Sequence, residues 1–387
     1  MKKLLFITYA FDHSTPVGVG AQRIVSALAG QGFHVFVIAS QNCVIDNPDV
    51  ELIVKTNFPR FPYFLANVFG NILGRDLFYI FWELKAFWAG LSVLKRNPDI
   101  VAIYTRANPI SVCHVGLKLK NKFRIPILMH FTDPIPAPIE WNRNIKDRKR
   151  MISQMKRVLP QADLVSFGNQ HMLNYQEFVL GYPLKEKSFI SPDPGSCELR
   201  FLPPKKANCD SYSLLFLGNI YGNRNPSHLF EAIGMLANCS IKLFIYGNNK
   251  ENFPDFVIKK DRTEDICSVM QNMDVLVDID GDDKTPVFVS SKLKDYLSVN
   301  RPILSISPVN SPSRDLLSNL NTVTTTVNDA ESIKKALLIL MNNDFRDSDY
   351  AERKKIISLF DPHVIASRIR SHIQSLALPY DLENSKS

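Results

Sequence analysis

The clearest structural signal in this sequence is the stretch Tyr212–Pro226, which reads YSLLFLGNIYGNRNP. An apolar run with strand-forming composition ends at Gly218, where glycine permits a sharp turn after a strand. Asn225 and Pro226 then form the start signal of a helix, an N-cap residue followed by proline at the first helical position. A buried strand, a glycine-containing loop and a helix are the repeating unit of a parallel sheet with crossover helices.

The same alternation of strand and helix extends in both directions from this stretch. In the second half, further strands are predicted at Ile241–Tyr246, Asp274–Asp280, Pro302–Ser307 and Thr322–Val327. In the first half, strands are predicted at Lys3–Tyr9, Phe33–Ala39, Glu51–Lys55, Asp99–Tyr104, Ile125–His130 and Asp163–Phe167. Helices are predicted at Val19–Gly30, Arg75–Arg96, Pro226–Leu236, Ser291–Val299, Ala330–Met341 and Pro362–Leu376. The predicted fold class is therefore α/β, with parallel sheets.

A chain of 387 residues exceeds the size at which one hydrophobic core keeps growing, so two domains are expected. We place the boundary in the irregular stretch Ser191–Pro204, which contains four prolines. This divides the chain into residues 1–195 and 196–361, two Rossmann-like domains facing each other. Ligands are expected at the carboxyl ends of the strands, in the crevice between the domains.

The composition, with 45% hydrophobic and 22% charged residues, is that of an ordinary globular protein. The six cysteines include no C-x-x-C pair, which argues against structural zinc and a disulfide framework and fits a reducing cytosol.

The apolar run Leu4–Ile7 is soon followed by Asp12 and His13, which favours a first strand over a signal peptide, and no segment is long enough to span a membrane. We therefore expect a cytoplasmic protein, and its net charge of +8 suggests an anionic partner.

The loop after the first strand has Gly18 and Gly20 at the start of a helix. Glycines there let the backbone approach a phosphate, and the helix N-terminus offers free N–H groups. Arg23 stands where a dinucleotide fingerprint would have its third glycine, so NAD binding is poorly supported. Contact with a phosphate or sugar and a tight turn without a ligand both remain open.

In the second half, two helix starts carry polar side chains suited to a nucleotide. Arg224 precedes the helix that begins near Pro226, where its planar fork can hold a diphosphate through two hydrogen bonds. The hydroxyls of Ser290 and Ser291 can cap the next helix and face an anion, and Asp295, one turn later, can accept hydrogen bonds from ribose hydroxyls. A surface arginine and an ordinary capped helix are the structural alternatives.

Taken in order, these motifs resemble a known family. The spacing Gly218-x5-Arg224, the pair Tyr246-Gly247 and the run SKLKDYL at Ser291–Leu297, followed by RPIL at 301–304, are similar to the C-terminal half of family 4 glycosyltransferases. The likeness extends to the first glycine loop, to HFTDP at 130–134 and to SPDPG at 191–195. The resemblance implies the GT-B fold, a nucleotide-sugar donor, no further cofactor, and a C-terminal helix (362–387) joined to the first domain. Most members of the family retain the configuration of the transferred sugar.

The resemblance also assigns roles to residues of the donor site. Arg224 falls where the family keeps a basic contact to the donor diphosphate, and Asp295 matches the second acid of its Glu-x7-Glu pair, which binds the ribose. Val287 stands in place of the first acid, and Asn219 occupies a position that is often basic in relatives. Arg224, together with Lys292, would stabilise charge on the leaving diphosphate. The complete expected donor site is Gly18, Gly20, Asn219, Arg224, Ser290, Ser291, Lys292 and Asp295. No metal is expected.

Catalysis is expected from the segment that follows a central strand of the first domain. The family often has a histidine directly before an aspartate there, whereas this chain has His130 three residues before Asp133. The resemblance implies that Asp133 orients the acceptor hydroxyl or accepts its proton, and that His130 polarises the donor. A packed histidine at a strand end and an aspartate that shapes the turn before Pro134 are the alternatives.

An aromatic segment and a basic segment of the first domain suggest contact with a membrane. The aromatic residues are Phe58, Phe61, Tyr63, Phe64, Phe69, Phe78, Tyr79, Phe81, Trp82, Phe87 and Trp88. The basic residues are Arg143, Lys146, Arg148, Lys149, Arg150, Lys156 and Arg157. An ordinary core and a solvated basic face explain the same residues without a membrane, and no nucleic-acid-binding module is recognisable.

Together these observations predict a glycosyltransferase that moves a sugar from a nucleoside diphosphate donor to a hydroxyl acceptor, with retention. The expected acceptor is a saccharide, lipid-linked or part of a surface polysaccharide such as O-antigen or capsule, handled at the cytoplasmic face of the inner membrane. Two alternatives remain open. One is a nucleotide-sugar epimerase of the same fold, and the other is a non-catalytic nucleotide-sugar-binding subunit, which the missing acid at Val287 favours.

Overall fold

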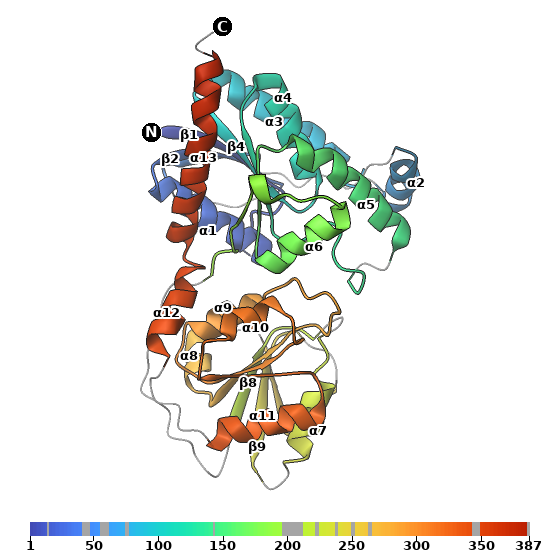
Figure 1. Ribbon diagram of the computed structural model, residues 1–387, viewed down its shortest axis with the longest axis vertical. Helices are drawn as coiled ribbons and strands as arrows, with labels where there is room; N and C mark the ends of the chain where they lie inside the picture. Colours follow the sequence, from blue (N-terminus) through green and yellow to red (C-terminus); the bar gives the residue numbers. More distant parts are fainter. Residues whose placement is uncertain are drawn as a thin grey trace. The chain divides into compact units, whose positions relative to one another are not determined.

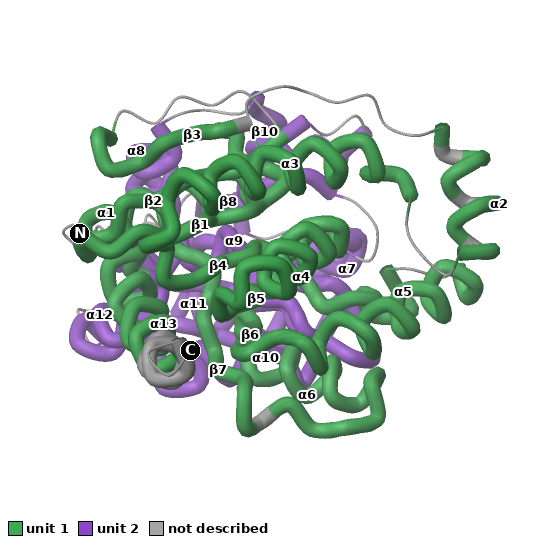
Figure 2. The backbone as a smooth tube through the Cα atoms, turned by 90° about the horizontal axis from the view of Figure 1, so that it is seen from above, with its two compact units in different colours: residues 1–194, 361–387 green, residues 195–360 purple. Residues whose placement is uncertain are grey.

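The computed structural model of the chain describes residues 1–13, 15–40, 47–54, 62–73, 77–141, 144–195, 212–220, 224–236, 239–248, 252–261, 265–342 and 349–384. The chain divides into two compact units, residues 1–194 with 361–387 (unit 1) and residues 195–360 (unit 2), which Figure 2 shows in different colours. Each unit is built around one parallel sheet, as the labelled strands and helices of Figure 1 show.

Unit 1 contains a seven-stranded sheet in the order β3-β2-β1-β4-β5-β6-β7, with every strand pair parallel. Its strands are β1 (Lys2–Thr8), β2 (Phe33–Ile38), β3 (Val50–Val54), β4 (Ile100–Ala107), β5 (Ile127–Phe131), β6 (Leu164–Phe167) and β7 (Ser188–Ile190). Its helices are α1 (Pro16–Gly30), α2 (Tyr63–Leu73), α3 (Ile80–Arg96), α4 (Ser111–Phe123), α5 (Ile145–Val158), α6 (Gln170–Leu180) and α13 (Pro362–Asn384). The central strands are almost wholly apolar because helices cover both faces of a parallel sheet.

Unit 2 contains a six-stranded parallel sheet in the order β10-β9-β8-β11-β12-β13. Its strands are β8 (Tyr212–Leu217), β9 (Ile241–Tyr246), β10 (Val257–Lys260), β11 (Val275–Ile279), β12 (Ile303–Ile306) and β13 (Val323–Thr326). Its helices are α7 (Ser227–Gly234), α8 (Ile266–Gln271), α9 (Ser291–Leu297), α10 (Pro312–Leu317), α11 (Ala330–Asn342) and α12 (Tyr350–Ser358). Helices α7 and α11 share one apolar core with the sheet, and α9 and α12 share a second core on its other face.

The predicted α/β class with parallel sheets is confirmed. Each strand predicted from the sequence is present, and Tyr212–Leu217 and Ile241–Tyr246 have the predicted ends. Among the predicted strands, the largest difference in an end is in β4, which ends at Ala107 rather than at Tyr104. The strand continues through Arg106, a charged residue that sequence patterns place outside a buried strand. The short strands β7 and β10 were not predicted, since neither has an apolar run long enough to indicate a strand.

The C-terminal helix α13 belongs to unit 1, more than 300 residues from the helix on which it packs. One face of α13 is buried in the same core as α1 and β1. The buried residues of this face are Ile365, Ala366, Ile369 and Ile373. Arg370 adds a hydrogen bond to the backbone carbonyl of Gln31, at 2.8 Å, just after the end of α1.

Both sheets have a point at which the strand order reverses. In unit 1, β1 pairs with β2 on one side and β4 on the other, and in unit 2, β8 pairs with β9 and β11 in the same way. At such a switch point the loops at the carboxyl ends of the two strands lead away from each other and leave room for a ligand. Ligand sites are therefore expected at the ends of β1 and β4, and at the ends of β8 and β11.

Candidate functional site

In unit 1, the glycine loop after β1 is packed tightly against protein groups. Thr15 caps α1 by accepting a hydrogen bond from the Gly18 N–H at 3.1 Å, and its own hydroxyl donates to Asp12 at 2.8 Å. A Cβ at Gly18 would lie 2.4 Å from the Asp12 carbonyl oxygen, and a Cβ at Gly20 would lie 2.8 Å from Nη2 of Arg106. Both glycines are therefore required by close packing. A contact of this loop with a phosphate or sugar stays a prediction.

Arg106, near the carboxyl end of β4, is a buried cation that the sequence analysis missed. Its side chain is 1% exposed and donates to the Asp193 carboxylate at 2.5 Å and to the Val17 carbonyl. A guanidinium without a partner would be very unfavourable at this depth, so Asp193 makes the position tolerable. The available signal was a charged residue inside the otherwise apolar run of β4.

His130, the penultimate residue of β5, has protein partners at both ring nitrogens. Nδ1 lies 3.0 Å from the Ser166 hydroxyl, and Nε2 lies 3.5 Å from the same Asp193 oxygen that Arg106 contacts. Burial lowers the pKa of His130, although Asp193 opposes this shift, so the neutral ring is favoured. This geometry is that of a packed histidine at a strand end, and polarisation of a donor by His130 stays a prediction.

Asp133 follows β5 and is half-buried at the carboxyl edge of the same sheet. Its Oδ2 accepts a hydrogen bond from the Asn108 side chain at 3.0 Å. Burial, and to a smaller extent the negative charge of Asp193, raise the pKa of Asp133. A carboxylate with a raised pKa is a better proton acceptor for a hydroxyl group than an ordinary aspartate. The structure thus gathers Arg106, His130, Asp133 and Asp193 at one edge of unit 1.

In unit 2, the loop after β8 is joined to the loop after β9. Gly218 has a φ of 131°, which favours glycine, and a Cβ at Gly247 would lie 2.4 Å from the Gly218 carbonyl oxygen. Asn219, a predicted donor contact, uses its side-chain oxygen to accept the Asn248 N–H at 2.9 Å. The structure shows Asn219 in this bridging role, and its contact with a donor stays a prediction.

Arg224 lies just before α7, which begins at Ser227 rather than at Pro226 as predicted. Asn225 still caps the chain at this point, since its side-chain oxygen accepts the Ser227 N–H at 3.0 Å and the Ser227 hydroxyl at 2.6 Å. The hydrogen bond from the Ser227 N–H to Asn225 closes a turn before the first helical residue. Pro226 therefore lies just outside α7 rather than in its first position. Arg224 is half-buried, and its positive charge acts on Asp278 and Asp280 at the carboxyl end of β11.

The start of α9 lies at the same edge of unit 2. Ser290 is buried and caps α9, accepting the Lys292 N–H at 3.3 Å, as predicted, whereas Ser291 is exposed. Lys292 and Asp295 are half-buried. Tyr296 accepts the backbone N–H of the last β8 residue at 2.9 Å, which ties α9 to the switch point.

Val287, where the family has its first acid, is 1% exposed. The position is therefore part of the packed interior of unit 2, and an ionised carboxylate there would be strongly disfavoured without a partner. In the ranges that the structure describes, no group of three or more His, Cys, Asp or Glu side chains is arranged to hold a metal ion.

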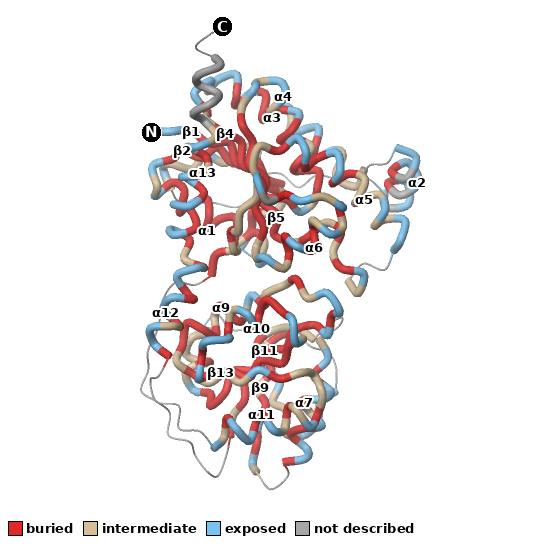
Figure 3. The backbone as a smooth tube through the Cα atoms, in the orientation of Figure 1, coloured by how far each residue is buried: buried red, intermediate tan, exposed pale blue. Residues whose placement is uncertain are grey.

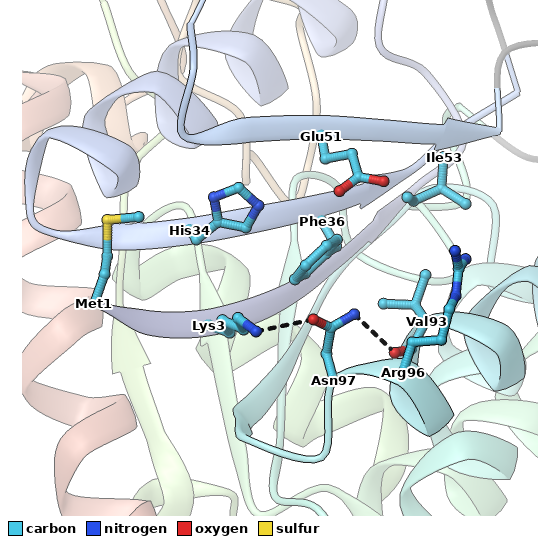
Figure 4. Close-up of a pocket in the computed structure, with 9 residues that line it drawn as sticks. All are labelled: Met1, Lys3, His34, Phe36, Glu51, Ile53, Val93, Arg96 and Asn97. Atoms are coloured by element: carbon cyan, nitrogen blue, oxygen red, sulfur yellow. Dashed lines mark hydrogen bonds between the residues drawn. The ribbon is translucent and has the colours of Figure 1, made fainter.

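A cavity of about 480 Å³ lies on the β1–β3 side of unit 1, next to the C-terminal end of α3 (Figure 4). Lys3 crosses it to donate to the Asn97 side chain at 2.9 Å. The remaining lining residues are Met1, His34, Phe36, Glu51, Ile53, Val93 and Arg96. None of the predicted site residues is among them, so this cavity is separate from the candidate site.

Comparison with known proteins places these two units in a recognised class. No protein-family model matches the sequence, and no curated protein sequence matches it. Solved structures of glycosyltransferases match nearly the whole chain, at identities that show the fold alone. The chain therefore has the GT-B fold, with two Rossmann-like units, as the sequence predicted.

Three of these structures illustrate the likeness. A glycosyltransferase from Rickettsia africae has a TM-score of 0.68 and 12% identity, over 97% of this chain and 98% of that chain. Anabaena HepE in complex with UDP has a TM-score of 0.62 and 14% identity, over 96% and 100% of the two chains. The lipopolysaccharide outer core galactosyltransferase WaaB has a TM-score of 0.64 and 12% identity, over 96% and 99%.

Proposed function

We propose that this protein is a glycosyltransferase that transfers a sugar from a nucleoside diphosphate donor to a hydroxyl group of a saccharide acceptor. The observation that carries the proposal is the position of Arg224 beside the β8–β11 switch point of a GT-B chain, together with the capped start of α9. HepE has been solved with UDP and with UDP-glucose, which supports a uridine nucleotide sugar as the first donor to test.

In this proposal unit 2 binds the donor and unit 1 binds the acceptor. Arg224 and Lys292 contact the diphosphate and stabilise its charge as it leaves, because fixed cations at the leaving group lower the barrier for its departure. Asp295 binds the ribose hydroxyls. Asp133 orients the acceptor hydroxyl or accepts its proton, a role that its raised pKa supports. Membership of family 4 and retention of configuration rest on the sequence motifs alone.

One observation favours a second candidate, a non-catalytic nucleotide-sugar-binding subunit. The buried Val287 stands where the family has the first acid of its donor site. We therefore propose incubating the protein with a panel of nucleotide sugars, with and without oligosaccharide acceptors. Transfer that requires an acceptor supports the glycosyltransferase, conversion of the donor without an acceptor supports the epimerase, and binding without turnover supports the subunit.

The acceptor role of Asp133 has its own test. Asp133→Asn should lower turnover strongly and leave the affinity for UDP-glucose almost unchanged, because Asp133 belongs to unit 1. Turnover would be followed by UDP release and affinity by calorimetry. A variant that loses donor affinity while keeping its maximal rate contradicts the assignment.

A lipid-linked acceptor is supported by the apolar surface of α2, which Figure 3 shows as largely exposed. On this helix the small residues Ala66 and Gly70 are buried, whereas large apolar side chains are exposed. The exposed side chains are Phe64 (75%), Leu65 (39%), Val68 (41%), Phe69 (47%), Ile72 (75%) and Leu73 (61%). A soluble helix normally buries its large apolar side chains, so this reversed arrangement favours contact with a membrane.

Neighbouring helices extend this surface. Phe81, Leu84 and Trp88 form an exposed stripe on α3, while Trp82, one of the predicted aromatic residues, is buried core. Helix α5, which lies near α2 in Figures 1 and 2, exposes four of the predicted basic side chains. These are Lys146, Lys149, Lys156 and Arg157. The predicted residues Phe58, Phe61 and Arg143 lie outside the described ranges.

The membrane proposal has a direct test with anionic vesicles. No helix of the described residues has the length and apolar character needed to cross a membrane. We expect binding at low salt that weakens as salt screens the basic residues of α5. The double variant Phe64→Ser with Ile72→Ser should reduce binding, whereas Phe178→Ser, which removes an 84% exposed side chain from α6, should not. Equal binding by both variants would remove α2 from the proposal.

A further inference from the structure

The carboxyl end of β11 carries two buried carboxylates that no predicted role includes. Asp278 is 2% exposed, and Asp280, the residue directly after the strand, is 7% exposed. Side chains two residues apart in extended backbone point to the same side, so the two carboxylates share one face of the sheet. Within the described part of the chain, Oδ2 of each is buried without a hydrogen-bond partner.

The surroundings of this pair contain one strong cation. Arg224, from the loop after β8, places positive charge near both carboxylates. Ser290, the cap of α9, donates a hydrogen bond to Asp278. The other groups that face the pair are Asp283 in the following loop, Ser313 of α10 and the buried hydroxyl of Tyr296 in α9. Burial raises the pKa of Tyr296 far above its usual value, so its ring stays neutral.

Two ionised carboxylates and one guanidinium would leave a net negative charge in the interior of unit 2. Two nearby carboxylates in such a place hold one proton between them, because the second ionisation must occur beside the first charge. Burial and the charge of Asp278 raise the pKa of Asp280 to about 7. Burial also raises the pKa of Asp278, which Arg224 and Ser290 oppose. Near neutral pH, the group therefore consists of one ionised carboxylate, one protonated carboxyl group and the guanidinium of Arg224.

We propose that Asp278 and Asp280 are positioning residues that hold Arg224 at the donor site, and that a nucleotide sugar binds only when the pair holds one proton. This inference rests on the proposed function, because it requires the diphosphate to contact Arg224. The diphosphate draws the guanidinium charge toward itself and brings further negative charge close to the carboxylates. Both effects favour the protonated form of the pair, and the proton comes from solvent.

The inference predicts how donor affinity depends on pH. Below the pKa of the free pair the proton is already present, and binding has no additional cost. Above pH 7, the pair must be reprotonated for the donor to bind, so the dissociation constant should rise by up to about tenfold per pH unit. UDP-glucose is the appropriate probe, because both of its phosphates are esterified and neither titrates between pH 6 and about 8.5.

The test is calorimetry with UDP-glucose from pH 6 to about 8.5, in buffers that differ in ionisation enthalpy. For the unmodified protein we expect little proton uptake at pH 6, and, above pH 7, growing proton uptake and a falling affinity. Asp280→Asn removes the titrating group and keeps the shape of the side chain, so it should bind with an affinity nearly independent of pH. Asp282→Asn changes the net charge by the same amount at an exposed position of the same loop, and should keep the pH dependence.

Each outcome decides the inference. Binding of UDP-glucose at pH 8.5 without proton uptake, or a pH dependence unchanged in both Asp280→Asn and Asp278→Asn, overturns it while leaving the proposed function intact. Absence of binding at every pH counts against the donor assignment and this inference together. If Asp280→Asn does not fold, the proton count of the unmodified protein and the Asp278→Asn variant still decide.

Discussion

At the scale of single residues, each unit buries a group of charged side chains near the carboxyl ends of its strands. In unit 1, two buried bases, Arg106 and His130, meet at one carboxylate, Asp193. In unit 2, two buried carboxylates face one arginine, Arg224. Burial lowers the pKa of His130 and favours its neutral ring, whereas burial and the charge of Asp278 raise the pKa of Asp280, so the second pair shares a proton.

The ion pair of unit 1 predicts a measurable stability effect. Asp193→Ala leaves the Arg106 guanidinium buried without its carboxylate, so the free energy of unfolding should fall by roughly 3 kcal/mol. This value is at the lower end of the range for a broken buried ion pair, because Asp193 is a third exposed. Urea denaturation measures this. The control is Asp99→Ala, which breaks the exposed Lys3–Asp99 pair and should cost less than about 1 kcal/mol. Equal losses would show that Arg106 does not depend on Asp193.

The donor assignment predicts different ligand profiles for two residues of unit 2. Arg224→Ala should weaken UDP by roughly 1.5–3 kcal/mol, the range for a charge-assisted hydrogen bond, and leave uridine almost unaffected. Asp295→Ala should weaken uridine and UDP by similar factors, because both carry the ribose hydroxyls. Calorimetry with uridine, UDP and a deoxy analogue distinguishes them. If Arg224→Ala weakens uridine as much as UDP, the diphosphate does not lie at Arg224.

At the scale of elements, glycines allow two loops of unit 2 to touch. The loop after β8 turns at Gly218, and the loop after β9 approaches it so closely that Gly247 has no space for a side chain. The Asn219 side chain then hydrogen-bonds across the contact. This contact joins the ends of β8 and β9 at Gly218, Asn219 and Asn248.

A pair of glycine substitutions tests this contact. Gly247→Ala forces a Cβ to 2.4 Å from the Gly218 carbonyl oxygen, so unit 2 should lose roughly 1–3 kcal/mol of stability, and UDP affinity should fall as the loop shifts. Gly234→Ala, in α7, meets nothing within 4 Å and should be neutral or stabilising by up to about 1 kcal/mol. Thermal unfolding of both variants measures the difference. A neutral Gly247→Ala would mean that the loops can separate without loss.

At the scale of the whole molecule, the chain enters unit 2 after Pro194 and returns to unit 1 at Asp361. Helix α13 then completes the core of unit 1 against α1. Unit 1 is thus assembled from the two ends of the sequence, and its stability depends on residues that follow the whole of unit 2 in the chain.

This arrangement predicts where a mutation near the C-terminus acts. Ile369→Ala removes a fully buried side chain and should destabilise unit 1 by about 2–5 kcal/mol. Hydrogen exchange should show lower protection of amides in α1 and β1, with amides of β8 and β11 unchanged. Val364→Ala, at a 41% exposed position of the same helix, should have little effect. Loss of protection in unit 2 alone would contradict the assignment of α13 to unit 1.

Local sequence patterns determined the elements of this protein. The apolar runs at Tyr212–Leu217 and Ile241–Tyr246 became strands with the predicted ends, and Ser290 caps α9 as predicted. Such features depend on residues adjacent in the chain, which sequence reasoning can examine directly. The alternation of strand and helix was likewise sufficient for the α/β class, because parallel strands require crossover helices.

Tertiary structure alone decided which side chains meet. Arg106 and Asp193 are 87 positions apart, and nothing in the sequence around either residue names the other. The sequence likewise did not show that Asp12 and Arg106 fill the space beside Gly18 and Gly20, where a side chain would otherwise lie. A charged residue in an apolar strand, such as Asp278, has no interpretable role until the groups facing it are known. Its ionisation depends on burial and neighbouring charge, and both arise only when distant segments pack together.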